Sequence, residues 1–273
     1  MSGIKLPMIV MAGSGGEEDK DALLEYANVE YKALIELGGK TILERVLAAI
    51  NESGVVTKTY VIGLPENKIT IPEGMDPSTV KCLEIEGADV PTRLDEATKF
   101  VMEEAKSDPS LFPHGSYHGL FCSGDIPFLK GEMIRDFVEQ CGDLENDLYP
   151  SIVREEVMVK RFPESKRTYG KITEGRYCVG DVHIFDYSMV EARLDRVRVL
   201  RKNRKNFAMT VFRLKPSIVF RFLIGRLGMK HLVKATNKVF KVHAEFISTK
   251  YAELAMDVDK PHQLELAKAE FKS

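Results

Sequence analysis

A glycine-rich turn near the amino terminus contains the first residues that are suited to chemistry. The apolar run at 5–12 breaks into the small residues MAGSGG, which include Gly13, Gly15 and Gly16. Because glycine has no side chain, such a turn lets backbone amides approach a ligand and donate to phosphate oxygens. Lys32 adds a positive charge that suits the same phosphates. A structural turn is the alternative, and the spacing matches neither a dinucleotide-binding GxGxxG nor a P-loop.

Carboxylates in two later segments suit metal binding. Asp125 lies in CSGDIPF, at the polar end of an apolar stretch. A carboxylate there can bind Mg²⁺ on the phosphates of a nucleotide, because this ion prefers hard oxygen ligands. A turn or capping role is the alternative. Asp257 and Asp259 precede Pro261, and proline is common in the first turn of a helix, so capping is the simpler interpretation for Asp259 alone.

Length and composition favour one domain with an elaboration. The chain has 273 residues, of which 44% are hydrophobic, so it can bury a substantial core. Its longest apolar stretches are shorter than a bilayer-spanning helix requires, and its first residues lack the apolar run of a signal peptide. We therefore expect a soluble, cytoplasmic protein.

Hydrophobic periodicity predicts the elements that must position these residues. Strands are expected at 5–12, 59–64, 80–87 and 117–128, alternating with helices at 41–50, 92–106 and 130–141. Thr92 and Asp95 resemble a capping arrangement for the second of these helices. This alternation predicts an open parallel sheet with helices on both faces and ligands at the carboxyl ends of its strands.

The remainder of the chain is expected to return to the sheet and end in a helix. From 149 the sequence predicts strands and hairpin-like turns, with a reversal at Glu174–Gly175. Residues 188–242 have a helical pattern, and a last helix is expected at 261–271.

Together these motifs resemble a known group of enzymes. GSGG with YKALIELGGK, then GDIP, then DVDKPHQLELAKAEF are similar to the nucleotidyltransferases related to molybdenum-cofactor guanylyl- and cytidylyltransferases and to sugar-phosphate nucleotidyltransferases. The resemblance covers 5–187 and 243–271. It implies a glycosyltransferase-A-like α/β fold with a mostly parallel central sheet and helices on both faces, in a single domain, 1–273, with 188–242 as a basic helical insertion.

The resemblance also implies an activity and a set of site residues. The enzyme would transfer a nucleoside monophosphate from a nucleoside triphosphate to a phosphorylated small molecule or lipid phosphate, releasing pyrophosphate. Lys32 and Asp125 would be catalytic, and Asp125 and Asp259 would hold Mg²⁺ or Mn²⁺. Nucleotide contacts would come from Ala12, Gly13, Ser14, Gly15, Gly16, Lys32, Gly87 and Thr92. Arg161, Arg167 and Lys171 lie where acceptor-binding strands are expected; a solvated hairpin face is the alternative.

Two features depart from these relatives. Glu17, Glu18 and Asp19 follow the glycines where a basic residue is usual, and their negative charge is expected to weaken triphosphate binding. The second feature is a segment, 193–241, with fifteen Lys and Arg against one acid.

The basic segment has three interpretations. Its interleaved cationic and apolar residues suit a lid or homodimer contact, or binding to an anionic membrane surface, which would make the protein membrane-peripheral. Nucleic-acid binding is the third, but the segment has no helix-turn-helix or RNA-binding signature, so we expect no specific nucleic-acid partner.

Two other functions are compatible with the same residues. The first is a metal-dependent glycosyltransferase that uses a nucleotide-sugar donor, with Asp125 or the DVD segment holding the metal. The second is a nucleotide- or membrane-binding regulator in which the acidic residues 17–19 weaken catalysis.

Overall fold

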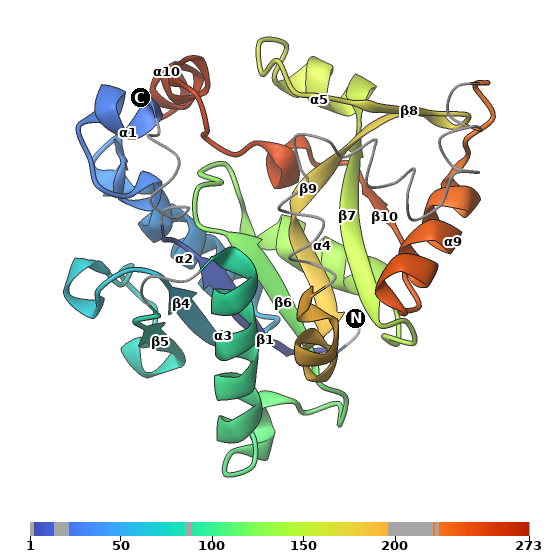
Figure 1. Cartoon of the computed structure of the whole chain (residues 1–273). Coiled ribbons are helices and arrows are strands. Elements are labelled where there is room, and N and C mark those ends of the chain that lie inside the picture. The colour runs from blue at the N-terminus through green and yellow to red at the C-terminus, as the bar shows by residue number, and fades with distance from the viewer. Residues whose placement is uncertain (1–2, 14–21, 86–88, 196–220, 222–223, 273) are drawn as a thin grey trace.

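The chain forms an eight-stranded mixed sheet with helices on both faces, as Figure 1 shows. This computed structural model describes residues 3–13, 22–85, 89–195, 221 and 224–272. Across the sheet the strands are β10 (Ile247–Thr249), β7 (Leu148–Arg154), β9 (Gly175–Asp186), β6 (His118–Ser123), β1 (Leu6–Met11), β4 (Val56–Ile62) and β5 (Val80–Leu83), and β8 (Gly170–Ile172) pairs with β9. The predicted fold class, with a mostly parallel central sheet, is confirmed.

Strand direction decides where the loops gather. β9 runs antiparallel to β6 and β7, whereas β1 is parallel to β4 and β6, and β10 is parallel to β7. The carboxyl ends of β1, β4, β6, β7 and β10 therefore meet at one edge of the sheet. The loops at this edge carry the glycine turn, Asp125 and Asp259.

Helices and short turns connect the strands. The helices are α1 (Ala22–Ala27), α2 (Ile42–Ser53), α3 (Val90–Glu104), α4 (Gly131–Gln140), α5 (Glu155–Arg161), α9 (Met229–Phe240) and α10 (Pro261–Glu270). Short 3-10 turns are η1 (Lys32–Leu34), η2 (Glu66–Lys68), η3 (Pro77–Thr79), η4 (Pro109–Leu111), η5 (Tyr187–Met189) and η7 (Ala252–Ala255), and β2 (Glu36–Leu37) pairs with β3 (Lys40–Thr41).

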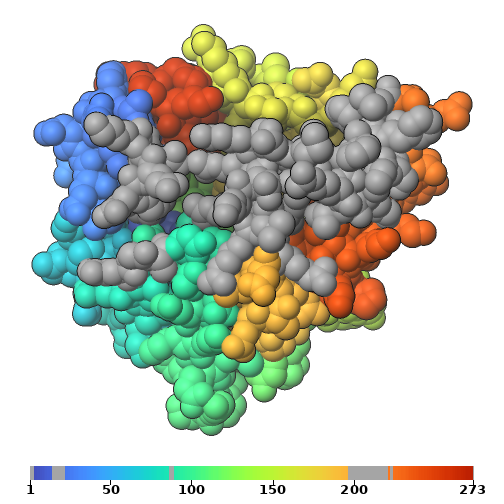
Figure 2. All heavy atoms as spheres, viewed as in Figure 1, coloured from blue at the N-terminus to red at the C-terminus, as the bar shows by residue number. Residues whose placement is uncertain are grey.

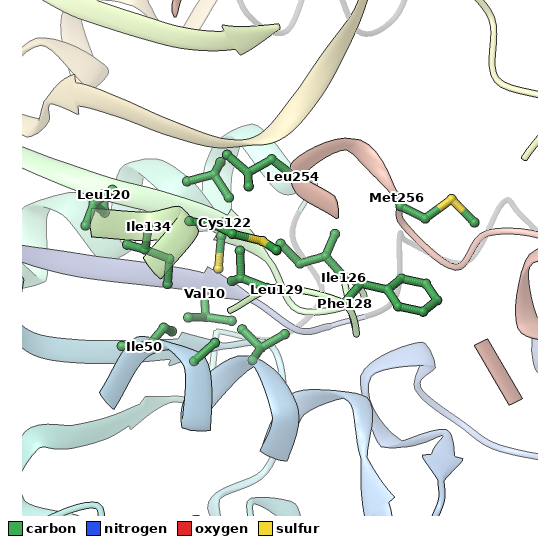
Figure 3. Packing of buried hydrophobic residues seen from close by; sticks show 14 of the residues in the cluster. Val10, Ile50, Leu120, Cys122, Ile126, Phe128, Leu129, Ile134, Leu254 and Met256 are labelled. Atoms are coloured by element: carbon green, nitrogen blue, oxygen red, sulfur yellow. The ribbon is translucent and has the colours of Figure 1, made fainter. Parts of the chain in front are cut away.

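β1 is the centre of the core because all six of its residues are buried. Met8 and Val10 belong to the larger apolar cluster, which includes residues of α2 and α4, and Figure 3 shows Val10 with Ile50 of α2 and Leu120 of β6. Ile9 faces the opposite side, in the cluster that α3 covers. A strand buried on both faces is typical of parallel sheets and explains its continuous apolar sequence.

The predicted helix at 41–50 is confirmed and extends to Ser53. Thr41 is its N-cap: the Thr41 hydroxyl accepts a hydrogen bond from the Glu44 amide, and the Glu44 carboxylate accepts one from the Thr41 amide. Gly54 ends the helix with φ of 68°, a conformation that favours glycine. This capping box satisfies backbone donors that the first turn leaves unpaired.

Two local predictions are wrong. α3 begins at Val90, with Asp89 rather than Thr92 as its N-cap, and Asp95 instead pairs with Lys99. Residues 155–161 form helix α5 rather than a strand. Acidic residues in the first turn and basic residues in the last turn of α5 complement the helix dipole, and this charge pattern favours a helix.

The other predicted elements have mixed outcomes. The reversal before Gly175 is confirmed, since β8 and β9 flank it, and the last helix is confirmed as α10. Much of the predicted insertion at 188–242 lies outside the described residues, at 196–220 and 222–223, so the insertion stays a prediction. Every helix in the described ranges is too short or too polar to cross a membrane.

Replacing Thr41 with alanine tests the capping box. We expect Thr41→Ala to lower the free energy of unfolding by about 1 kcal/mol, because the Glu44 amide loses its acceptor. Urea denaturation monitored by circular dichroism measures this change. Thr41→Ser keeps the hydroxyl and should remain within a few tenths of a kcal/mol of the parent. Equal losses in both variants would contradict the role of the hydroxyl.

Candidate active site

The glycine turn begins where three loops come into close contact. The amides of Ala12 and Gly13 both donate to the carbonyl of Ile62, at 3.0 and 3.1 Å. A Cβ on Gly13 would lie only 2.7 Å from the carbonyl oxygen of Gly63, so glycine is required for the loops after β1 and β4 to touch. On the other side, the Gly124 amide donates to the Met11 carbonyl at 2.8 Å. Gly13 therefore has a packing role, whatever ligand the turn binds.

Several predicted nucleotide contacts fall outside the described residues. These are Ser14, Gly15, Gly16 and Gly87, and the acidic residues 17–19 lie there as well. Thr92 is described, and both its amide and its hydroxyl donate to the Asp89 carboxylate at the start of α3.

Arg93 is a cation at the base of the glycine turn that sequence analysis missed. It lies in the first turns of α3 and is only 7% exposed. A Cβ built on Gly13 would lie 2.6 Å from its Nη1 atom, so the guanidinium is in direct contact with the turn. Nothing in the local sequence distinguishes Arg93 from a surface arginine, because its position depends on packing between β1 and α3.

Lys32 and Asp259 are brought together from opposite ends of the chain. The Lys32 ammonium, in η1, donates to Oδ1 of Asp259 at 2.6 Å. The Lys32 side chain is 23% exposed and that of Asp259 is 49% exposed, so the ion pair lies at the surface of the site. Asp259 is not a helix cap: its amide donates to the Gln263 side chain, and Lys260 is the N-cap of α10.

Asp125 lies in the turn after β6, next to the segment that carries Asp259. The Val258 amide donates to the Asp125 carbonyl at 3.0 Å, and the Ser123 hydroxyl donates to the Asp125 carboxylate at 2.5 Å. Burial raises the pKa of Asp125, and the Ser123 hydrogen bond opposes this rise. The negative charge of Asp259 raises that pKa further, and the positive charge of Lys32 lowers it. The three predicted residues therefore act on one another electrostatically.

Asp181 is a further carboxylate at this site that the sequence did not indicate. It lies on β9, one residue before the Val182–Cys122 pair that joins β9 to β6. Burial raises its pKa to about 7. Arg167 opposes this rise in pKa, whereas the charges of Asp125 and Asp259 add to it. Oδ2 of Asp181 is buried and has no hydrogen-bond partner among the described residues.

Arg167 lies between Asp181 and Asp257. Its Nη1 atom forms an ion pair with Asp257, and its Nη2 atom is 3.8 Å from Oδ2 of Asp181. Asp181 lies on β9, and Asp257 is two residues before Asp259 in the sequence. Arg167 therefore introduces positive charge next to β9. Of the three predicted acceptor residues, Arg167 is the one that forms ion pairs with these carboxylates in the described ranges.

The other two predicted acceptor residues lie in different surroundings. Arg161 is on α5, where it forms ion pairs with Glu253 and Glu270 at 2.8 and 2.5 Å and packs over the Phe162 ring. These contacts join α5 to η7 and α10. Lys171 is an exposed residue of β8, opposite Arg176 of β9.

The carboxylates are chemically suited to Mg²⁺ or Mn²⁺. Asp125 and Asp259 supply hard oxygen ligands. Burial is the main cause of the raised pKa of Asp125 and the charge of Asp259 adds to it, and a divalent cation would relieve that repulsion. Within the described ranges, no cluster of three or more His, Cys, Asp or Glu side chains is arranged to hold a metal ion. Two carboxylates nevertheless suffice for Mg²⁺ when substrate phosphates supply further ligands.

Asp181 provides a test of this electrostatic arrangement. Because its folded-state pKa is raised, the folded protein is penalised as pH rises from about 4 through 7. We expect Asp181→Asn to raise the free energy of unfolding at pH 8 by roughly 1–3 kcal/mol. The gain should shrink as pH falls toward 4, where the folded-state carboxyl is neutral and about half of the unfolded-state carboxyl is protonated. Urea denaturation at pH 5 and pH 8 measures it.

Asp186→Asn is the matched control, since Asp186 is on the same strand and accepts hydrogen bonds from Ser188. Its effect should not become more stabilising as pH rises. A gain for Asp181→Asn that is equal at both pH values would contradict the assignment of Asp181 as a partly buried carboxylate among like charges.

Comparisons with known proteins support the fold. No protein-family model matches the chain, and no curated protein matches its sequence. Among solved structures, the chain is similar to a hypothetical transferase from Thermus thermophilus, with 26% identity and a TM-score of 0.72 over 95% of this chain and 99% of the other.

More distant structures have named activities. A 2-C-methyl-D-erythritol 4-phosphate cytidylyltransferase, also from Thermus thermophilus, is 15% identical, with a TM-score of 0.52 over 99% of this chain and all of its own (100%). A CMP:2-keto-3-deoxy-manno-octonic acid synthetase complexed with CTP is 11% identical, with a TM-score of 0.55 over 98% of both chains. The chain therefore has the α/β fold that these nucleotidyltransferases share.

Proposed function

We propose that this protein is a nucleotidyltransferase that transfers a nucleoside monophosphate from a nucleoside triphosphate to a phosphorylated acceptor and releases pyrophosphate. The observation that carries the proposal is the meeting of Lys32, Asp125 and Asp259 at the carboxyl edge of the sheet. The fold shared with a synthetase complexed with CTP and with a cytidylyltransferase supports it, and makes CTP the first nucleotide to test.

Residues around the carboxyl end of β1 are proposed to bind the triphosphate. Asp125 and Asp259 would hold a divalent cation, which would supply neutralisation of the phosphate charge. Lys32 exchanges Asp259 for the β- and γ-phosphates and stabilises the charge that develops on pyrophosphate. Arg93 adds positive charge beside Gly13. The remaining nucleotide contacts are proposed to be Ala12, Ser14, Gly15, Gly16, Gly87 and Thr92.

Residues next to β9 are proposed to bind the acceptor. Arg167 is suited to an acceptor phosphate, because a guanidinium donates two parallel hydrogen bonds to phosphate oxygens. Its ion pair with Asp257 fixes the guanidinium at the site before the acceptor binds. Lys171, on the same hairpin, contributes a more distant positive charge, and Arg161 positions α5 through its ion pairs. The acceptor is a phosphorylated small molecule or a lipid phosphate.

The reaction needs no protein nucleophile. An ionised oxygen of the acceptor phosphate attacks the α-phosphorus and forms a new phosphorus–oxygen bond, while the bond from the α-phosphorus to the bridging oxygen of pyrophosphate breaks. The attacking oxygen carries no proton, so no general base is required. Positioning of the two phosphates and stabilisation of the leaving charge supply the rate.

Asp125→Asn tests the proposed function. Purified protein is incubated with each of four nucleoside triphosphates, Mg²⁺ and pooled sugar, polyol and lipid phosphates, and pyrophosphate release is measured. We expect acceptor-dependent release by the parent and a loss of at least about a hundredfold in the variant, because the variant lacks one charge of the proposed metal site. Lys32→Met should lose activity by a similar factor.

Asp136→Asn is the matched control, because Asp136 lies on α4 and pairs with Lys250 rather than with site residues. It should retain full activity. Full activity of Asp125→Asn would contradict the site assignment. Release of a nucleoside diphosphate from a nucleotide sugar, without pyrophosphate release from any triphosphate, would favour the glycosyltransferase alternative. Triphosphate binding without turnover across the whole panel would favour a regulator.

A further inference from the structure

One side of helix α9 carries a row of lysines. Lys230, Lys234 and Lys238 are spaced by four residues, so they lie on one side of the helix, and all three are exposed. None of them forms an ion pair with another described residue. The helix contains no acidic residue. We call Lys230, Lys234 and Lys238 the lysine row.

The opposite side of α9 packs on the protein. Met229, Leu232 and Ala235 contact a small apolar cluster formed by Ile172 of β8 and the buried Leu227. The helix is therefore amphipathic, with its apolar side satisfied by the β8–β9 hairpin and its lysine row facing solvent. Figure 1 shows α9 at the edge of the molecule, and its orange surface lies at the right-hand edge in Figure 2.

Hydrogen bonds at both ends hold α9 in place. The Met229 amide donates to Oε1 of Glu174 at 3.0 Å, which places a carboxylate at the helix N-terminus. After the helix, the Ala244 amide donates to the Asn237 side chain at 2.9 Å, just before β10. The lysine row is thus a fixed part of the folded domain.

Other exposed residues extend this surface. Arg226 and Lys241 flank the helix and are exposed, and neither forms an ion pair with a described residue. The surface of α9 therefore presents aligned positive charges to solvent. The acidic side chain in contact with the helix start, Glu174, is engaged by the Met229 amide and the Thr173 hydroxyl.

We propose that the lysine row binds the surface of a bilayer that contains anionic lipids. A straight row of flexible ammonium groups matches a plane of diffuse negative charge, and each lysine near such a plane strengthens binding about fivefold. Nucleic acid is a poorer match, because the row contains no arginine and no aromatic side chain that would contact base edges or stack on bases.

The helix that carries the lysine row packs on a hairpin that also holds a proposed acceptor residue. The β8–β9 hairpin that supports α9 also carries Lys171, and Arg167 immediately precedes it. Binding through the lysine row does not depend on the proposed transferase activity.

Vesicle sedimentation with the full chain tests this proposal. Vesicles of pure phosphatidylcholine are compared with vesicles that contain phosphatidylserine, at low and physiological salt. We expect the parent to bind the anionic vesicles, with binding that weakens as salt rises. The triple variant Lys230→Glu, Lys234→Glu, Lys238→Glu should lose about a hundredfold or more in partition coefficient.

The matched control reverses three exposed lysines elsewhere: Lys5, Lys40 and Lys106. It changes the net charge by the same amount and should lose at most about tenfold. Thermal unfolding by circular dichroism establishes that both variants are folded. Equal losses in the two variants, binding to pure phosphatidylcholine that matches binding to the anionic vesicles, or absence of binding by the parent would each overturn the proposal. So would binding of duplex DNA or RNA by the parent, but not the row variant, at salt that abolishes vesicle binding.

Discussion

The hydrogen bond from the Val258 amide to the Asp125 carbonyl is the contact on which the site depends. It joins the turn after β6 to the segment between β10 and α10, so carboxylates from distant parts of the chain share one small region. The parallel arrangement of β6 and β10 within the sheet brings these two loops to the same edge. Electrostatic coupling between Asp125 and Asp259 follows from this backbone contact.

Bringing like charges together has a cost that the protein offsets with cations from other elements. Lys32 of η1 pairs with Asp259, and Arg167 pairs with Asp257. Asp181 is the least compensated carboxylate, and its raised pKa reflects burial together with the neighbouring negative charges. A region with excess negative charge, two cations and a hard-oxygen donor set is suited to binding a polyanionic substrate together with a divalent cation.

Local sequence signals predicted the frame of this site but not all of its members. The helix at 41–50, the apolar run of β1 and the turn at Asp125 depend on nearby residues, so they could be recognised in the sequence. Asp181 and Arg93 could not, because their burial depends on strand pairing and helix packing between distant segments. Lys32 and Asp259 were identified through resemblance to known enzymes, but their direct ion pair was not predicted.

A crystal structure grown with Mg²⁺ and a non-hydrolysable analogue of CTP would show whether this edge of the sheet binds a metal–triphosphate complex. We expect triphosphate oxygens within hydrogen-bonding distance of the Lys32 ammonium, Mg²⁺ bound by Asp125 and Asp259, and loss of the Lys32–Asp259 ion pair. A triphosphate bound elsewhere on the molecule, with that ion pair intact, would contradict this expectation.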